Sequence, residues 1–261
     1  MIIKDMDAIK KEYGRKRRTA IENAEEAVYE EKKMEEMEVC FLMDRFGYMK
    51  LIDKNAYERN KEAVHNENKY VFNCMNTDKI CIFTDTGKMH TIKAVDIPLG
   101  RFRDKGTPVD NLSNYDSSQE RMLYVAPVGQ LRSDRLLFVT KTSMCKLVEG
   151  AEFDVAKRTI ASTKLADEDE LIFIGSASEM EQIVLQSHGG CFLRFLAQEV
   201  STMKKTALGV RGMKLADDDY LEHAYLLAGH QEYTISYHDK EYALNKVRLA
   251  KRDTKGIKPR I

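Results

Sequence analysis

The sequence has no long apolar run and no net charge. Its longest uninterrupted apolar stretches are only about five residues, among them 136–139 and 171–174, and no hydrophobic block follows the opening Met-Ile-Ile-Lys-Asp. A membrane-spanning helix needs about 20 apolar residues, so we expect neither a membrane span nor a secretory signal. The 42 Lys and Arg residues balance 42 Asp and Glu residues, which excludes a whole-chain attraction to nucleic acid or membrane. Electrostatic recognition must therefore be local, and we expect a soluble, cytoplasmic protein.

Disulfide and metal-binding patterns are also missing. The five cysteines are odd in number, widely scattered and never form a Cys-x-x-Cys pair: Cys40, Cys74, Cys81, Cys145 and Cys191. The histidines lack the spacing of metal ligands, as the positions of four of them show: His90, His188, His223 and His238. We expect no metal site, and we interpret the cysteines as small buried apolar residues in a reducing compartment.

Residues 1–38 contain no proline and a single glycine, Gly14, and they are rich in Lys, Arg, Glu, Ala and Met. These are good helix formers, so the sequence predicts a mostly helical segment. Thr19 with Glu22 forms a possible capping box, followed by a narrow apolar stripe of Ile21, Ala24 and Val28. After residue 38 the sequence changes to short β-branched and aromatic runs separated by Gly, Asn, Asp and Ser, which predicts an all-β domain over residues 39–261.

A strand, a polar turn of the type Asp-x-x-Gly and a second strand with a basic residue recur along the β region. The copies span residues 41–50, 82–93, 138–146, 184–194 and, more weakly, 235–245, with serine in place of glycine at Ser143. The first turn residues of successive copies are 40 to 56 residues apart, which is the length of a four-stranded propeller blade. The repeats therefore predict five blades.

A basic loop also recurs, once for each blade except the first, and an apolar segment follows it. These loops span residues 101–108, 157–165, 204–215 and 251–258. Repeat geometry would place them on one rim, so that positive charge gathers there although the domain is nearly neutral. Residues 166–182, with six acidic residues and no basic one, would supply an opposite, acidic surface.

At three places the sequence resembles the A subunits of bacterial type IIA topoisomerases: residues 11–21, residues 83–98 and residues 209–215. The resemblance covers nearly the whole chain. It implies that residues 1–38 are a helical segment from the end of the cleavage core, and that residues 39–261 form a five-bladed β-pinwheel. In this family the pinwheel is a propeller-like disc that binds and bends duplex DNA around its perimeter.

The resemblance also indicates what belongs to the parent enzyme rather than to these residues. The catalytic tyrosine of the family precedes the part that this chain resembles, so no catalytic residue and no cofactor are expected here. ATP and Mg²⁺ would act only in the parent, an ATP-dependent type II DNA topoisomerase of the bacterial nucleoid. The implied partners are duplex DNA, the rest of the A subunit and the ATPase B subunit.

Within the family, gyrase is distinguished by a box reading Gln-Arg-Arg-Gly-Gly-Lys-Gly after its first blade. The corresponding residues 57–66 of this chain lack both the glycines and the basic cluster. This departure favours the A subunit of topoisomerase IV, which would present DNA for decatenation and relaxation. Residues 251–256 echo the box at the far end of the chain, so the DNA-wrapping domain of gyrase stays open as the alternative.

The predicted DNA contacts are the basic residues of the second hairpin strands and of the recurring loops. They are Lys50, Lys93, Arg101, Arg103, Lys105, Lys146, Lys157, Arg158, Arg194, Lys204, Lys205, Arg211, Lys246, Arg248, Lys251, Arg252, Lys255 and Lys258. Phosphates would be held by charge, and DNA would be selected by its deformability rather than by its base edges. A propeller that docks an acidic protein partner is the alternative from another functional class.

Overall fold

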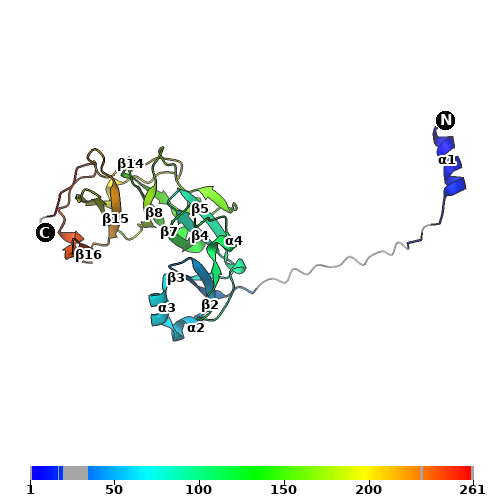
Figure 1. Cartoon of the computed structure of the whole chain (residues 1–261), viewed down its shortest axis with the longest axis horizontal. Coiled ribbons are helices and arrows are strands. Elements are labelled where there is room, and N and C mark those ends of the chain that lie inside the picture. Colours follow the sequence, from blue (N-terminus) through cyan, green and yellow to red (C-terminus); the bar gives the residue numbers. More distant parts are fainter. Residues whose placement is uncertain (1, 17, 20–34, 230–231, 260–261) are drawn as a thin grey trace. The chain divides into compact units, whose positions relative to one another are not determined.

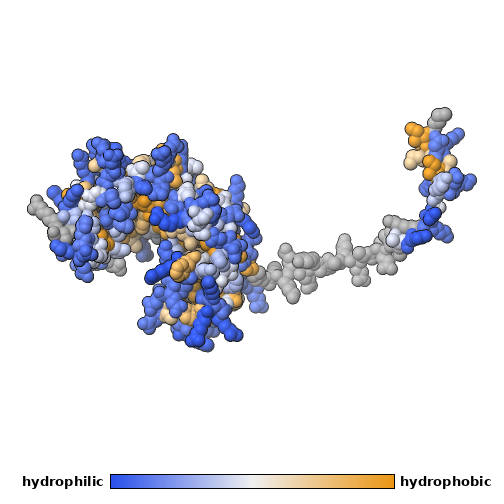
Figure 2. All heavy atoms as spheres, in the orientation of Figure 1, coloured by the Kyte–Doolittle hydropathy of each residue, from blue (hydrophilic) through white to orange (hydrophobic). Residues whose placement is uncertain are grey.

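The computed structural model describes residues 2–16, 18–19, 35–229 and 232–259 (Figure 1). The chain divides into two units, Met1–Glu35 and Glu36–Ile261. In the first unit, helix α1 spans Ile2–Tyr13 and none of its residues is buried. Apolar residues gather on this helix in Figure 2. The predicted capping box and the stripe at Ile21, Ala24 and Val28 fall on or run into residues 20–34, which lie outside the described residues.

The second unit is built from antiparallel sheets, as expected for an all-β domain. In the described residues the first three sheets have four strands each, in the orders β3-β1-β2-β6, β10-β5-β4-β7 and β11-β8-β9-β14. A three-stranded sheet, β13-β12-β15, and a hairpin, β16-β17, follow. The sheets succeed one another from blue to orange in Figure 1 and do not close into a ring.

The strands are short, most of them four to eight residues. Their bounds are β1 Glu38–Asp44, β2 Tyr48–Asp53, β3 Asn68–Met75, β4 Lys79–Thr84, β5 Lys88–Lys93, β6 Thr107–Pro108, β7 Met122–Pro127, β8 Arg135–Thr140, β9 Met144–Glu149, β10 Thr159–Ala161, β11 Leu171–Ser176, β12 Gln182–Ser187, β13 Phe192–Leu196, β14 Val210–Arg211, β15 Leu221–Leu227, β16 Thr234–Tyr237 and β17 Lys240–Ala243.

Short helical turns connect many of these strands. They are α2 Lys54–Arg59, α3 Lys61–Glu67, η1 Ala94–Asp96, α4 Val109–Leu112, α5 Val128–Leu131, η2 Gly150–Phe153, η3 Ala197–Glu199 and η4 Leu244–Lys246. No helix in the described part of the chain is long and apolar enough to cross a membrane.

Each of the first three sheets receives an edge strand from the segment that follows the next sheet's central hairpin. β6 comes after β5 in sequence yet pairs with β2, with Met49 opposite Thr107. In the same way β10 pairs with β5 and β14 pairs with β9. A bridge between Phe192 and Ile257 repeats this connection on the fourth sheet. Successive sheets are therefore interlocked by exchanged edge strands.

The exchanged strands lie on the outside of the array. Strands β3, β7, β11 and β15, one from each of the first four sheets, contact their neighbours in order and so occupy the inner edge. In every four-stranded sheet the exchanged strand is at the opposite edge. The segments that lead into β6, β10 and β14 are therefore on the perimeter.

The hydrophobic core lies between successive sheets. The first strands of the hairpins, such as β4 and β8, are buried along nearly their whole length because both faces are covered by neighbouring sheets. The ring of Phe83 meets that of Phe153 edge to face, with centroids 4.9 Å apart. The cysteines are free, and those at positions 40, 74, 81 and 145 are buried, so the interpretation of these four as small core residues is confirmed.

The turn glycines behave as predicted from the repeats. Gly47, Gly87 and Gly190 all have positive φ, which glycine adopts without steric cost. Ser143 replaces glycine in the third hairpin and also has a positive φ of 71°. Its buried hydroxyl accepts a hydrogen bond of 2.7 Å from the Met213 backbone N–H, which helps to offset the strain.

Candidate nucleic-acid interface

Four loops of equal length run along the outer edge, one against each of the first four sheets. Three of them begin at a residue bridged to the second hairpin strand, namely Leu99, Thr202 and Leu249, and each reaches a glycine seven residues later. Counted back from the exchanged strand, the second sheet has its counterpart at residues 152–159. This loop follows a different path, because the Thr91 N–H donates to the Arg158 carbonyl at 2.8 Å near the loop's end, whereas Leu51 and Leu147 donate to the residue before the loop's start. We call residues 99–106, 152–159, 202–209 and 249–256 the outer loops.

Glycine ends three of the outer loops for a steric reason. At Gly106 a Cβ would lie 2.6 Å from the Met49 carbonyl oxygen, and at Gly209 it would lie 2.6 Å from that of Cys145. Both glycines, and Gly256 at the end of the fourth loop, have positive φ. A larger residue would push the loop away from the sheet, so glycine allows the exchanged strand to dock directly after the basic segment.

The outer loops carry most of the predicted contacts, and many of these side chains are exposed. Eight of them form no ion pair with any described residue: Arg101, Arg103, Lys105, Lys157, Arg158, Lys204, Lys251 and Lys255. Because equivalent loops lie on successive sheets, these cations form a row along the perimeter. A row of exposed cations without carboxylate partners suits a polyanion better than it suits a single small ligand.

Lys146 is a correction to the sequence-based prediction. Its side chain is 1% exposed, and its ammonium donates hydrogen bonds of 2.7 Å to the carbonyl oxygens of Lys205 and Ala207 in the third outer loop. Burial lowers the pKa of Lys146 to about 8. This buried ammonium therefore holds the third outer loop against the sheet through its hydrogen bonds, and it is not accessible to a phosphate.

Lys50 occupies the same position in the first sheet. Its ammonium donates to the carbonyls of Phe102 and Asp104, which have the same spacing before the loop glycine as the carbonyls that Lys146 holds. Burial also lowers the pKa of Lys50. In the second sheet His90 takes this place, 3.1 Å from the Thr159 hydroxyl. The basic residues of the second strands thus position the loops, and the loops themselves present the exposed cations.

Three further predicted contacts hold backbone atoms on the outer edge. Arg194 donates to the Asn245 carbonyl, and Lys205 donates to the Glu152 carbonyl at 2.7 Å. Arg252 donates to the carbonyls of Glu199 and Arg211 and is half-buried. These side chains contribute positive potential to the perimeter while their hydrogen-bond donors are partly engaged.

Arg211 forms a surface ion pair with Asp253 in the fourth outer loop, with Nε to Oδ1 at 2.5 Å and a second contact at 3.1 Å. More than half of the Arg211 side chain is exposed, so this pair lies in solvent. The remaining four predicted contacts are also exposed. Lys93 ends β5 and Lys246 ends η4, whereas Arg248 and Lys258 lie outside the helices and strands.

Sequence reasoning missed a difference in the second outer loop. Where the other three loops have Arg101, Lys204 and Lys251, this loop has the acidic Asp154. Its carboxylate accepts from Arg132 at 2.8 Å and lies 3.8 Å from the Lys79 ammonium. Arg132 follows α5 and has no counterpart in the repeats, so only the fold reveals that it sits beside the loop.

The acidic run also has a local structural role. The Asp169 carboxylate accepts hydrogen bonds from the Thr142 backbone N–H and hydroxyl, and Asp219 accepts from the Gly189 N–H at 2.9 Å. These acids brace the turns of the third and fourth hairpins. Asp169 belongs to the predicted acidic surface of residues 166–182, and its carboxylate is occupied in holding the third turn; Asp219 lies outside that surface.

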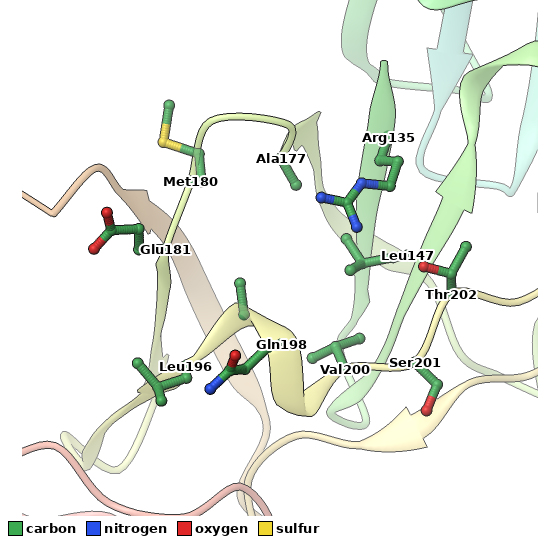
Figure 3. A pocket seen from close by; sticks show the side chains of 11 residues that line it. Arg135, Leu147, Ala177, Met180, Glu181, Leu196, Gln198, Val200, Ser201 and Thr202 are labelled. Atoms are coloured by element: carbon green, nitrogen blue, oxygen red, sulfur yellow. The ribbon is translucent and has the colours of Figure 1, made fainter. Parts of the chain in front are cut away.

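A hollow of about 520 Å³ between the third and fourth sheets is an alternative place for a ligand (Figure 3). Its walls include Leu147, Leu196 and Val200, and one guanidinium, that of Arg135, lies beside Leu147 and Ala177. Its lining includes a single cation, Arg135. The outer loops therefore remain the stronger candidate for a nucleic-acid interface.

Comparison with known proteins agrees with the architecture. The family model described as DNA gyrase C-terminal domain, beta-propeller, matches residues 78–117, 134–178 and 181–228, which together make up half of the chain. The chain belongs to the C-terminal domain family of type IIA topoisomerase A subunits. The three matched segments contain the central hairpins of the second, third and fourth sheets.

The relatives of this domain include much longer proteins. The DNA gyrase A subunit of Clostridium acetobutylicum is 29% identical over 81% of this chain and 27% of the relative. The gyrase A subunit of Salmonella typhimurium is 28% identical over 84% of this chain and 26% of the relative. The chain thus spans between a quarter and a third of the length of these curated relatives.

Solved structures show the same fold. A C-terminal domain of DNA topoisomerase IV matches with a TM-score of 0.74 and 22% identity, covering 86% of this chain and 73% of that one. The DNA gyrase A C-terminal domain matches with a TM-score of 0.56 and 18% identity, covering 85% and 76%. At these identities the likeness supports the propeller-like architecture of the family domain and does not separate its two branches.

Proposed function

We propose that this domain binds and bends duplex DNA for a type II topoisomerase, and that the parent is a topoisomerase IV. The outer loops would hold the phosphates of a duplex that follows the perimeter. The domain would thereby present DNA to an ATP-dependent strand-passage core for decatenation and relaxation. In this proposal ATP, Mg²⁺ and the catalytic tyrosine belong to the rest of the A subunit and to the B subunit, and the five sheets correspond to the five blades of a pinwheel.

The observation that carries the proposal is the repetition of exposed cations at one register of successive sheets. A duplex presents phosphates at regular spacing, and a curved row of cations can follow it over several of them. Phosphate contacts position a protein on DNA without reading its sequence. Bending a site of about 20 to 30 base pairs by about 40 to 90° costs about 1 to 6 kcal/mol, which a handful of phosphate contacts can offset.

Affinity for duplex DNA is expected to fall steeply with salt and to be independent of base sequence. If about five phosphates are neutralised, a plot of log affinity against log salt has a slope of about −4 to −5, because each contact releases close to one counterion. Fluorescence anisotropy with two unrelated 30-base-pair duplexes across a salt series measures both properties. An affinity that does not change with salt would contradict the electrostatic mechanism.

Two structural features support topoisomerase IV over gyrase. At the place of the gyrase box, residues 54–67 form α2 and α3, and Val64 of α3 is buried against the first sheet. The box-like residues 251–256 are fixed to the fourth and third sheets, where Asp253 N–H donates to the Gly212 carbonyl at 2.7 Å. They are the fourth outer loop rather than a latch beside the first sheet. Gyrase remains the second candidate because the sequence relatives bear that name.

The two candidates differ in how much they change DNA topology. Without a box after the first sheet, the duplex is expected to be bent but not fully wrapped. We expect little or no positive writhe when nicked circular DNA is sealed in the presence of this domain and its topoisomers are separated on gels. Substantial positive writhe that is abolished when Lys251, Arg252 and Lys255 are replaced by Ala would instead establish the gyrase alternative.

A further inference from the structure

The tip of the first hairpin carries an unusually exposed aromatic side chain. Phe46 lies in the turn between β1 and β2 and is 87% exposed, more than any other large apolar residue among the described ones. The equivalent turns of the other sheets have Thr86, Thr142, Gly189 and Asp239. An exposed phenylalanine has no role in the packing of this sheet, so an explanation has to come from outside the core.

The turn that holds Phe46 is tightly fixed. The Asp44 carboxylate accepts hydrogen bonds from the backbone N–H groups of Phe46 and Tyr48, at 2.8 and 2.9 Å. Gly47 has a φ of +83°, and its carbonyl accepts from the Val109 N–H at 3.0 Å. The backbone beneath Phe46 is therefore anchored from both sides, and the ring is presented to solvent from a fixed base.

The surroundings of Phe46 are cationic. A hollow of about 190 Å³ beside the tip is lined by Phe46 together with the side chains of Arg45, Lys69 and Arg121. All three cations are exposed, and of these only Arg121 contacts a described carboxylate, that of Asp85 at 3.6 Å. Asp44 and Asp110 also line the hollow, but their carboxylates accept hydrogen bonds from backbone N–H groups.

The hairpin tip also lies next to the end of the first outer loop. Lys105, near the end of that loop, places its ammonium 4.4 Å from the centre of the Tyr48 ring, two residues beyond Phe46. Strand β6, which follows the loop, pairs with Tyr48 through Pro108. A duplex bound by Arg101, Arg103 and Lys105 would therefore reach the hairpin tip at the end of the loop.

We propose that Phe46 is a wedge that inserts between base pairs of a duplex held by the first outer loop, while Arg45 binds a flanking phosphate. Apolar wedges of this kind unstack a base step and kink DNA by about 20 to 90°. Steps that unstack easily, of the pyrimidine–purine type, would set where the kink forms along a duplex. Because duplexes of mixed sequence contain several such steps, the overall affinity stays independent of base sequence. The inference rests on the proposed function, because it requires that the outer loops bind duplex DNA.

The chain contains no tryptophan, so a single introduced indole reports on this position without background. Phe46→Trp is expected to lose fluorescence and to become protected from iodide when duplex DNA is added, because an inserted indole stacks on bases. Ile9→Trp is the matched control. Ile9 is 58% exposed on α1, which carries neither an outer loop nor a hairpin tip, and it should remain accessible to iodide in the complex.

Phe46→Ala in the full chain is expected to reduce both the affinity and the bend angle, the latter measured by energy transfer between the ends of a 30-base-pair duplex. Losing the stacking of one aromatic ring on the bases should weaken the affinity by about tenfold. The slope against salt should not change, since phenylalanine carries no charge. Arg45→Ala should reduce that slope by about 0.9, the value for one phosphate contact.

Two outcomes would overturn the wedge. An unchanged bend and affinity in Phe46→Ala, or an indole at position 46 that is as accessible to iodide as the one at position 9, would show that Phe46 does not enter the DNA. If the unmodified chain binds with the expected salt dependence in that same experiment, the proposed function survives and only the wedge fails. If the unmodified chain does not bind duplex DNA at all, both fail together.

Discussion

Replacing Lys146 by Met is expected to lower the free energy of unfolding by about 2 to 4 kcal/mol. Met fills a similar volume but cannot donate, so the carbonyl oxygens of Lys205 and Ala207 lose the partner that holds them at 2.7 Å. Lys146 is 1% exposed, so water cannot readily replace it. The third outer loop would lose the hydrogen bonds that hold it against β9. Because β14 follows this loop directly, its pairing with β9 should weaken as well.

Chemical denaturation of the parent chain and of Lys146→Met measures this difference directly. Lys141→Met is the matched control, because Lys141 lies five residues earlier on the exposed turn of the same hairpin. Its ion pair with Glu170 is solvent-exposed, so its loss should change stability little. If the two variants were equally stable, the hydrogen bonds of Lys146 to the loop would not contribute to the folded state.

The pH dependence provides an independent check on the same lysine. Burial lowers the pKa of Lys146 to about 8 in the folded chain, against 10.5 for an ordinary lysine. Between these values the unfolded chain binds a proton that the folded chain has released, so stability rises with pH across this window. This pH-dependent part of the Lys146 contribution is lost as pH falls through 8, whereas the hydrogen bonds of the ammonium to the loop carbonyls persist below it. The stability difference between the parent and Lys146→Met should therefore grow from pH 8 to pH 10.

In the control residue, Lys141, the pKa is shifted in the opposite direction. The hydrogen bond to Glu170 and its charge raise the pKa of Lys141, so its contribution is fully present below 10.5 and is lost only at higher pH. The difference between the parent and Lys141→Met should stay constant from pH 8 to pH 10. A parallel rise in both variants would indicate a general effect of alkaline pH rather than the burial of Lys146.

The hairpins could be predicted from the sequence because each has its own local signal. A polar turn with glycine between two apolar strands repeats at Gly47, Gly87 and Gly190, and glycine there supplies the positive φ that the turn requires. The exchanged strands could not be predicted in this way. β6 and β14 have two residues each, too few for any periodicity, and they pair with strands more than 50 residues away in sequence.

The sequence predicted the outer loops of the candidate site, but it did not predict which basic residues hold those loops in place. Lys146 lies within β9 and Lys204 lies in the third outer loop, yet as basic residues of the recurring unit both were predicted to contact DNA. The fold places Lys204 on the surface, and it covers Lys146 with the loop of the next repeat, whose carbonyls take up its hydrogen bonds. Arg132 was missed for the same reason, since its proximity to Asp154 comes from packing between elements distant in sequence.

Replacing Arg101, Arg103 and Lys105 together by Ala is expected to weaken duplex binding by on the order of a hundredfold near 0.15 M salt. If each side chain contacts one phosphate, three counterions are no longer released, and the slope of log affinity against log salt becomes shallower by about 3. The three side chains are exposed and form no ion pair with a described residue, so the fold should be unaffected. The loss should be the same for all duplex sequences, because phosphates are common to all of them.

A charge-matched control separates local contact from net charge. Replacing Lys4, Lys10 and Lys11 of α1 by Ala removes the same three positive charges from exposed positions outside the sheets, on residues that tolerate Ala in a helix. The affinity of this variant, measured by the same anisotropy titrations, should stay within about twofold of the parent and its salt slope should not change, because α1 carries none of the predicted phosphate contacts and so releases no counterions. An equal loss in both variants would mean that DNA responds to total charge, and no loss in the loop variant would place the contact surface elsewhere than on the first outer loop.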